Sequence, residues 1–147
     1  MQCNHVYHNR NIWELLSHLK SGAHPKSALI DCLSDIQKNW HKSPNEQACA
    51  VYRSRRSGLW EKRNFNTGSA RSVNIDLKEI AKRIVDGKYN MIVLCHYHPA
   101  GSTKPSETDM RTTRMIANLC RSLDVQLHDH FIFGIRSCFS FREAGYL

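Results

Sequence analysis

The residues with the clearest chemical potential lie in one stretch, CHYHPAGSTKPSETD, at positions 95–109. His96 and His98 are two residues apart at the end of an apolar run, so on a strand both side chains leave the same face and can converge on one ion. Asp109 falls in the first turn of an expected helix, where the helix dipole favours a carboxylate. Two imidazoles and a carboxylate, with water in the fourth position, are typical of hydrolytic zinc sites. The spacing predicts one catalytic zinc ion per chain.

The elements that position these residues are predicted from apolar periodicity and from proline and glycine. Residues 91–95 form a short apolar run that predicts a buried strand. Pro99 prevents this strand from continuing, and Gly101 permits a sharp bend. A helix then begins at Ser106, whose side chain can cap it in a capping box with Asp109.

The rest of the chain predicts a mixed α/β order. Period-two runs and turn residues indicate strands, and apolar residues at helical spacing indicate helices. Asp76 can cap a further helix that precedes the buried strand. Helices are expected at 11–20 and from Pro25 to about 40, as an N-terminal helical hairpin, and strands at 46–52, 59–65, 125–133 and 137–141.

The spacing resembles the metal signature of the JAB/MPN metalloenzymes, also called JAMM proteases. That signature is His-x-His, seven residues, Ser, two residues, Asp, and it is matched without a gap by His96, His98, Ser106 and Asp109. The segments HYHPAGSTKPSETD, LHDHFIFG and FSFREAGYL are similar to the RadC branch of this family. The resemblance implies an α/β fold of the α+β type, with a JAB/MPN-like mixed sheet flanked by helices. The resemblance predicts an N-terminal helical extension at 1–44, followed by a JAB/MPN (RadC-like) domain at 45–147.

The same resemblance implies roles for further residues. It requires a catalytic glutamate on an earlier strand, where Glu46 stands, and such a carboxylate would move a proton from water to the leaving amine. Glu61 is an alternative, although it lies in a charged run that is typical of a solvent-facing strand. Ser106 would stabilise the oxyanion, in addition to capping its helix. Asp129 and His130 match the Asp-His pair of RadC-like sequences, and they either orient a metal ligand from behind or form a strand-end hydrogen bond.

Two positions depart from the His-Asn-His-Pro-Ser-Gly that is usual in RadC-like proteins. Tyr97 and Ala100 stand in place of the asparagine and the serine. Neither is a ligand, so we expect the metal site to survive and the rim of the cleft to differ. The first 44 residues match no helix-hairpin-helix DNA-binding region. Their hairpin is therefore left with three possible roles: to cover the cleft, to pair two subunits or to complete the core.

Length and composition exclude several protein classes. The chain has 147 residues, 41% hydrophobic and 23% charged, which suits one globular domain and not a disordered chain. Its longest apolar runs fall short of the roughly 20 residues that a membrane span needs, and the N-terminus carries no signal or lipidation motif. We expect a cytoplasmic protein without a membrane partner. The cysteines are then reduced thiols that fill the core: Cys3, Cys32, Cys49, Cys95, Cys120 and Cys138.

The formal net charge of +8 is unevenly distributed. Between positions 51 and 88, four acidic residues stand against ten basic ones: Arg53, Arg55, Arg56, Lys62, Arg63, Arg71, Lys78, Lys82, Arg83 and Lys88. Such a patch favours an anionic partner or is a solvated surface.

These observations give two hypotheses of function. The leading one is a zinc metallopeptidase or isopeptidase, whose substrate would be a protein, a peptide or a ubiquitin-like conjugate. The alternative is a RadC-like DNA-associated protein, acting in DNA repair or near mobile elements, that binds nucleic acid through basic residues 53–88. The two are compatible, and the sequence names neither the substrate nor the oligomeric state.

Overall fold

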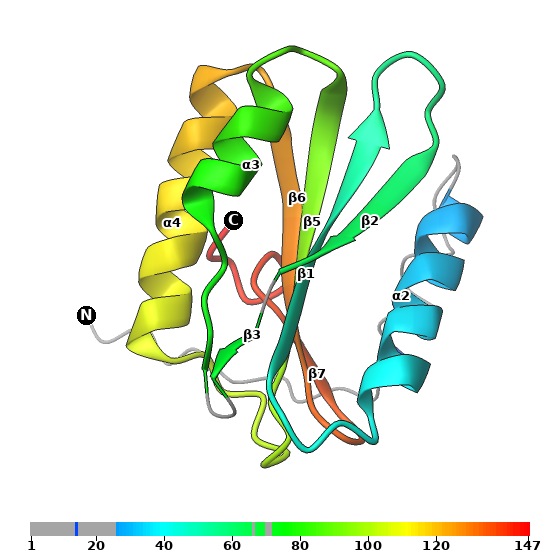
Figure 1. Ribbon diagram of the computed structural model, residues 1–147, viewed down its shortest axis with the longest axis vertical. Coiled ribbons are helices and arrows are strands. Elements are labelled where there is room, and N and C mark those ends of the chain that lie inside the picture. The colour runs from blue at the N-terminus through cyan, green and yellow to red at the C-terminus, as the bar shows by residue number, and fades with distance from the viewer. Residues whose placement is uncertain (1–13, 15–25, 66, 70–71) are drawn as a thin grey trace.

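The computed structural model describes residues 14, 26–65, 67–69 and 72–147. Its centre is a five-stranded sheet in the order β2-β1-β5-β6-β7 (Figure 1). The strands of this sheet are β1 (Gln47–Ser54), β2 (Trp60–Asn64), β5 (Tyr89–Tyr97), β6 (Gln126–Phe133) and β7 (Cys138–Ser140). β5 and β6 are parallel, whereas the other neighbours are antiparallel. A separate two-stranded sheet joins β3 (Thr67–Ser69) and β4 (Ser72–Val73).

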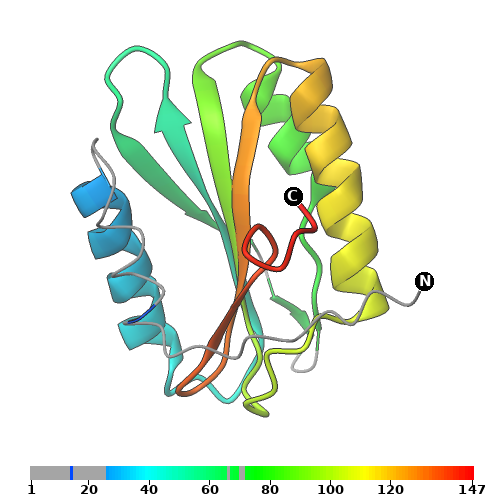
Figure 2. The ribbon, with the colours of Figure 1, turned by 180° about the vertical axis from the view of Figure 1, so that it is seen from behind.

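Helices cover both faces of the five-stranded sheet. α2 (Lys26–Trp40) lies on one face, and α3 (Leu77–Ile84) and α4 (Glu107–Ser122) lie on the other (Figures 1 and 2). The predicted mixed sheet flanked by helices is therefore confirmed. The helix expected at 11–20 lies outside the described residues. None of the helices in the described part of the chain combines the length and the apolar character that a membrane crossing requires.

α2 supplies one half of the core. Its apolar face buries Leu29, Leu33 and Ile36 in one cluster with Val51 and with residues of β5, β6 and β7. Of the three roles considered for the N-terminal hairpin, this helix completes the core. The division of the chain at residue 44 stays a prediction. Five cysteines are unpaired thiols, as expected for core residues, and Cys3 lies outside the described residues: Cys32, Cys49, Cys95, Cys120 and Cys138.

The other half of the core lies between the sheet and α3 and α4. Asp76 caps α3 by accepting hydrogen bonds from two backbone N–H groups, as predicted. β5 is longer than its apolar run, because β1 and β6 pair with it as far as Tyr97. The N–H of His98 still donates to the carbonyl of Phe133 at 2.9 Å. Pro99 then ends the strand, so both histidines stand at one end of the central strand.

An irregularity in β6 decides which of its side chains reach that end. Ile92 of β5 pairs with Leu127 and the next residue, Val93, pairs with Asp129, so His128 is an extra residue. A bulge of one residue reverses the alternation of faces along a strand. His130 therefore lies on the α4 face together with Leu127, whereas Asp129 lies on the α2 face.

Candidate functional site

The two histidines at the end of β5 lie side by side, with ring centroids 4.6 Å apart. His98 Nδ1 is 2.8 Å from the carbonyl oxygen of Ser102. A carbonyl oxygen only accepts, so Nδ1 carries the hydrogen and Nε2 presents its lone pair. This is the arrangement by which proteins orient a histidine that binds a metal through Nε2.

His96 is held in the same way by a carboxylate. Its Nδ1 lies 3.1 Å from Asp109 Oδ1, so this nitrogen donates and Nε2 again presents its lone pair. That Nε2 is buried and has no hydrogen-bond partner within the described chain. It lies 3.6 Å from Glu46 Oε2. A buried acceptor without a donor is costly, and a cation at this position would satisfy His96 Nε2.

Glu46 completes the tightest group of possible ligands. One ligand atom each from Glu46, His96 and His98 lie within 4.8 Å of one another. Glu46 directly precedes β1, and the antiparallel pairing of Ala48 with His96 brings it to the histidines. The nitrogen and oxygen donors suit zinc, which prefers such ligands. The residues therefore fit a divalent metal ion.

Asp109 touches both histidines from the first turn of α4. Its Oδ2 lies 3.9 Å from His98 Nε2 and accepts hydrogen bonds from Ser106 N at 2.8 Å and Ser106 Oγ at 2.7 Å. Burial by itself raises the pKa of Asp109, but the hydrogen bonds from His96 and Ser106 outweigh it and hold this pKa well below its ordinary value. The carboxylate is therefore ionised at neutral pH. Its role as the third ligand stays a prediction, because Glu46 takes that place in the tightest group.

Ser106 is the N-cap of α4. Its Oγ accepts from Asp109 N at 3.0 Å, and the Asp109 side chain accepts from the Ser106 backbone, which forms the predicted capping box. The hydroxyl has one proton, and it is directed at Asp109. The role of Ser106 in stabilising an oxyanion stays a prediction.

Comparison with known proteins places this arrangement in a family. Residues 25–146 match the family model described as a RadC-like JAB domain. The chain belongs to this family. The resemblance inferred from the sequence is thereby confirmed, and the matched region includes α2.

Several bacterial proteins named UPF0758 are similar to this RadC-like JAB domain. It is 34% identical over 102 residues to one from Ruegeria pomeroyi, which covers 69% of this chain and 46% of that protein. It is 33% identical over 98 residues to one from Burkholderia cenocepacia, which covers 67% of this chain and 38% of that protein. It is 34% identical over 100 residues to one from Neisseria meningitidis, which covers 68% of this chain and 44% of that protein. The chain matches less than half the length of these relatives.

His130 supports the site of this RadC-like JAB domain from behind. It is fully buried, its Nδ1 is 2.7 Å from Thr113 Oγ1, and Thr113 donates to the carbonyl oxygen of Asp109 at 2.6 Å. Burial, with the neighbouring His96, lowers the pKa of His130 to about 3, so the ring is neutral. The sequence analysis missed Thr113. Thr113 could have been found from the sequence, because it is a polar residue one helical turn after Asp109 on the otherwise apolar face of the expected helix.

Asp129 lies on the α2 face of the sheet and holds the strand that follows. It accepts hydrogen bonds from His130 N at 2.7 Å, Ser140 Oγ at 2.5 Å and Arg142 N at 3.0 Å. Burial raises its pKa to about 6. These contacts correspond to the strand-end hydrogen bonding considered for it, whereas His130 alone of the pair contacts the site through Thr113.

Two remaining expectations have plain outcomes. Tyr97 is buried under α2, and its Oη donates to the carbonyl oxygen of His41 at 3.3 Å, so the expectation that it alters the cleft rim is wrong. Ala100 is exposed in the turn after β5. Glu61, the alternative base, pairs with Tyr52 of β1, four residues from Ala48, which pairs with His96. The Glu61 carboxylate accepts a hydrogen bond from Tyr89 Oη. It lies apart from the histidines.

Proposed function

We propose that this RadC-like JAB domain is a zinc-dependent hydrolase of the JAMM type that cleaves an amide bond in a protein or peptide. One observation carries the proposal: His96 Nε2 is buried, has no hydrogen-bond partner among the described residues and faces Glu46, beside a second histidine whose Nε2 also presents its lone pair. When bound, one zinc ion per chain would supply Lewis-acid chemistry, polarising a carbonyl and activating water.

The two carboxylates suit different tasks because they differ in exposure. The Asp109 side chain is 8% exposed and bonded to Ser106, whereas the Glu46 side chain is 26% exposed. A buried, ionised carboxylate suits a permanent ligand alongside His96 and His98. A carboxylate that solvent reaches suits a base that takes a proton from water and delivers it to the leaving amine. We therefore assign proton transfer to Glu46 Oε2.

The proposed role of Ser106 requires one movement. Its hydroxyl proton must turn from Asp109 toward the oxyanion of the substrate, and the backbone N–H of Ser106 then remains to hold Asp109. A positioned donor of this kind is worth roughly 10² to 10³ in rate.

The decisive experiment compares two glutamates. Zinc-loaded protein is incubated with a panel of peptides and ubiquitin-like conjugates, and Glu46→Gln is expected to lower kcat by roughly 10² to 10⁴ with zinc retained. Glu61→Gln makes the same chemical change on an exposed strand and should leave kcat unchanged. Turnover that persists in Glu46→Gln, or after chelation of the metal, contradicts the proposal.

A second variant separates the two roles of Ser106. Glycine is tolerated at an N-cap with a loss of only a few tenths of a kcal/mol, so Ser106→Gly removes the hydroxyl without destroying the helix start. We expect kcat to fall while the unfolding free energy changes little. An unchanged kcat would leave Ser106 as a helix cap alone.

The proposal extends to the compartment and the substrate. Action in the cytoplasm is supported by the five unpaired cysteines of the described residues, because thiols stay reduced there. The substrate class remains a protein, a peptide or a ubiquitin-like conjugate, and the panel above distinguishes them.

Nucleic-acid binding through basic residues 53–88 is a second proposal. It is supported by a pocket at the end of β5 opposite His96, where Arg55, Arg56 and Lys88 outnumber the one carboxylate of the described lining residues, Glu61. Carboxylates neutralise part of the patch, since ion pairs join Arg55 to Asp124, Arg83 to Glu79 and Lys88 to Asp86. Retention on DNA that falls steeply with salt would support it, and no retention at low salt would remove it.

A further inference from the structure

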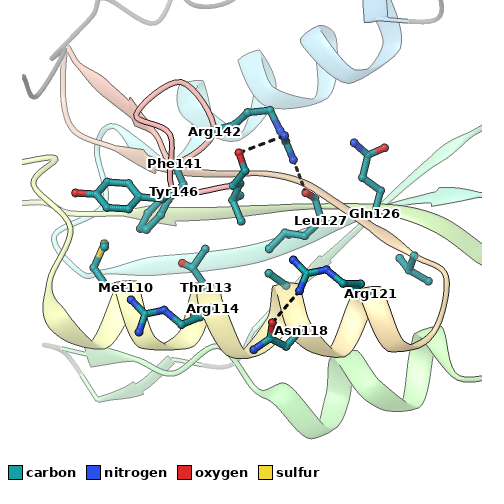
Figure 3. A pocket seen from close by; sticks show the side chains of 13 residues that line it. Met110, Thr113, Arg114, Asn118, Arg121, Gln126, Leu127, Phe141, Arg142 and Tyr146 are labelled. Carbon is teal, nitrogen blue, oxygen red and sulfur yellow. Dashed lines mark hydrogen bonds between the residues drawn. The ribbon is translucent and has the colours of Figure 1, made fainter. Parts of the chain in front are cut away.

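A pocket that contains none of the possible metal ligands lies between α4 and the C-terminal part of the chain (Figure 3). Its volume is about 410 Å³, which is within the range of small-molecule sites. Much of its lining is apolar: Met110, Ala117, Val125, Leu127, Phe141, Tyr146 and Leu147. An apolar lining of this size favours a ligand with a hydrocarbon or aromatic body.

The charged side chains of this pocket all have one sign, and the backbone oxygen of Leu147, the last residue, also lies in the pocket beside Arg142. Arg114 and Arg121 come from α4 and Arg142 from the turn after β7, and no Asp or Glu side chain of the described residues lines the pocket. Arg114 and Arg121 are seven residues apart, two helical turns or roughly 10 Å, so both side chains stand on one face. Within residues 26–65, 67–69 and 72–147, neither forms an ion pair. Their charge is therefore available to a ligand.

The third arginine is already engaged and has a different task. Arg142 donates to the carbonyl oxygens of Leu127, at 2.9 Å, and of His128, and to the backbone oxygen of Leu147 at 3.4 Å. These bonds fix the guanidinium in the wall across from α4 (Figure 3) and leave its positive charge in place. Arg121 makes one longer bond, at 3.3 Å, to the neighbouring Asn118. The two arginines of α4 are exposed and can adjust to an anion.

We propose that this pocket binds a small organic anion, namely a carboxylate or phosphate group joined to an apolar body. Guanidinium groups bind carboxylate and phosphate by paired, charge-assisted hydrogen bonds, and the apolar lining takes the rest of the molecule. A neutral ligand would leave the arginines uncompensated, and a cation would be repelled. A polyanion such as DNA would leave the apolar lining unused. This proposal is independent of the hydrolase proposal.

The pocket also borders the support of the metal cluster. Thr113 lines it and bonds His130, and Phe141 lines it and stacks on His130 with ring centroids 4.6 Å apart. A ligand in the pocket therefore touches residues that contact His130 from the side away from the cluster. The ring nitrogens of His130 provide a spectroscopic reporter of occupancy.

The test uses four ligands with the same eight-carbon body. The full chain is titrated with octanoate, octyl phosphate, 1-octanol and octylammonium below their aggregation limits, and binding is followed by calorimetry and amide NMR shifts. We expect both anions to bind at least about tenfold more tightly than octanol, with shifts at 113–127 and at His130. A preference for octanoate or for octyl phosphate identifies the anionic group, and either result supports the site.

Matched variants locate the effect. Arg121→Gln and Arg114→Gln are each expected to weaken octanoate about tenfold, whereas Arg56→Gln, which removes the same charge from another exposed position, should not. Thermal unfolding confirms that each variant is folded. Equal affinity for octanoate and octanol, or an equal loss in Arg56→Gln, overturns the proposal. So does an oligonucleotide or inorganic phosphate that binds as tightly as octanoate with the same dependence on Arg121.

Discussion

The two faces of strand β5 differ in what their side chains do, although the residues alternate one by one. His96 and, just beyond the strand, His98 lie toward Glu46 and the start of α4. Cys95 and Tyr97 lie toward α2, in the hydrophobic core. Alternation along a strand separates these tasks completely. A substitution such as Tyr97 for the usual asparagine therefore changes the core and leaves the ligand face as it was.

The neighbouring residues His96 and Tyr97 also differ in whether their polar atoms are satisfied. On the α2 side, the Oη of Tyr97 has a carbonyl acceptor. On the other side, His96 Nε2 is buried without a partner among the described residues. An unsatisfied buried group lowers stability, and a ligand that binds only the folded state returns stability. A cation at the histidine cluster would therefore satisfy His96, whereas Tyr97 is already satisfied within the core.

The largest expected effect is a loss of zinc affinity, and it appears when a substitution on one face is compared with a substitution on the other. His98→Ala leaves too few donors to hold zinc, and we expect its zinc affinity to fall by roughly 10³ or more. Cys95→Ala shortens a buried side chain on the other face, so it should lower the free energy of unfolding and leave zinc affinity unchanged. Competition against a chelator measures the affinities. Equal zinc affinities in the two variants would contradict the division between the faces.

Tyr97 tests the packing face more strongly. Tyr97→Ala removes a buried aromatic ring from the core under α2 and should cost at least about 3 kcal/mol of unfolding free energy. Tyr97→Phe removes only the hydrogen bond to His41 and should cost about 1 kcal/mol. Both variants should retain zinc affinity while folded. Urea denaturation gives the free energies, and a large loss of zinc affinity in Tyr97→Phe would show that the faces are coupled.

The next effect is a pH dependence at Asp129. Burial raises its pKa to about 6 in the folded chain, above the value near 3.9 that an unfolded chain has. Between these values the folded state keeps a proton that the unfolded state has released, so the unfolding free energy falls as pH rises from about 4 to 6. Asp129→Asn should remove this fall, because an amide stays neutral.

This pH dependence is measured by comparing the unfolding free energies of Asp129→Asn and of the native chain. The unfolding free energy of Asp129→Asn relative to the native chain should rise by roughly 2 to 3 kcal/mol between pH 4 and pH 7. His130 titrates in the opposite sense, since burial lowers its pKa to about 3, but it is present in both proteins and cancels. A difference that does not vary with pH would show that folding does not shift the pKa of Asp129.

The smallest effect concerns the turn that carries Ser102. A Cβ added at Gly134 would lie 2.7 Å from the carbonyl oxygen of Gly101 and 3.0 Å from Thr103 Cγ2. Gly134→Ala must therefore displace the segment that fixes His98, and we expect it to cost roughly 1 to 3 kcal/mol and to weaken zinc binding. Gly87→Ala is the control, because it meets no atom within 4 Å and is strained only by its positive φ. It should leave zinc affinity unchanged.

Much of the fold could be predicted because its signals are local. Ser106 and Asp109 cap α4, Asp76 caps α3 and Pro99 stops the strand, as expected. Each of these depends on atoms within about four residues in the sequence. The common face of His96 and His98 follows from strand geometry alone. The arrangement of the sheet was predicted less directly, through the resemblance to a family.

Contacts between distant segments were decided only by the tertiary structure. The extra residue at His128 determines that His130, and not Asp129, lies on the site's face. The register of β1 against β5 brings Glu46 to His96, and the position of α4 puts Asp109 on the Nδ1 side of that ring. Arg114, Arg121 and Arg142 meet around one pocket from two remote segments.

The physical reason for this division is the range over which each interaction acts. Capping, proline stops and face alternation are fixed by neighbouring backbone atoms, so residue types alone determine them. Which atoms of remote segments meet depends on strand register and on how helices pack against the sheet, where one inserted residue reverses a face. The sequence by itself determined the strand that carries His96 and His98 and the helix that carries Asp109 in this RadC-like JAB domain. Packing decided which side chains surround them.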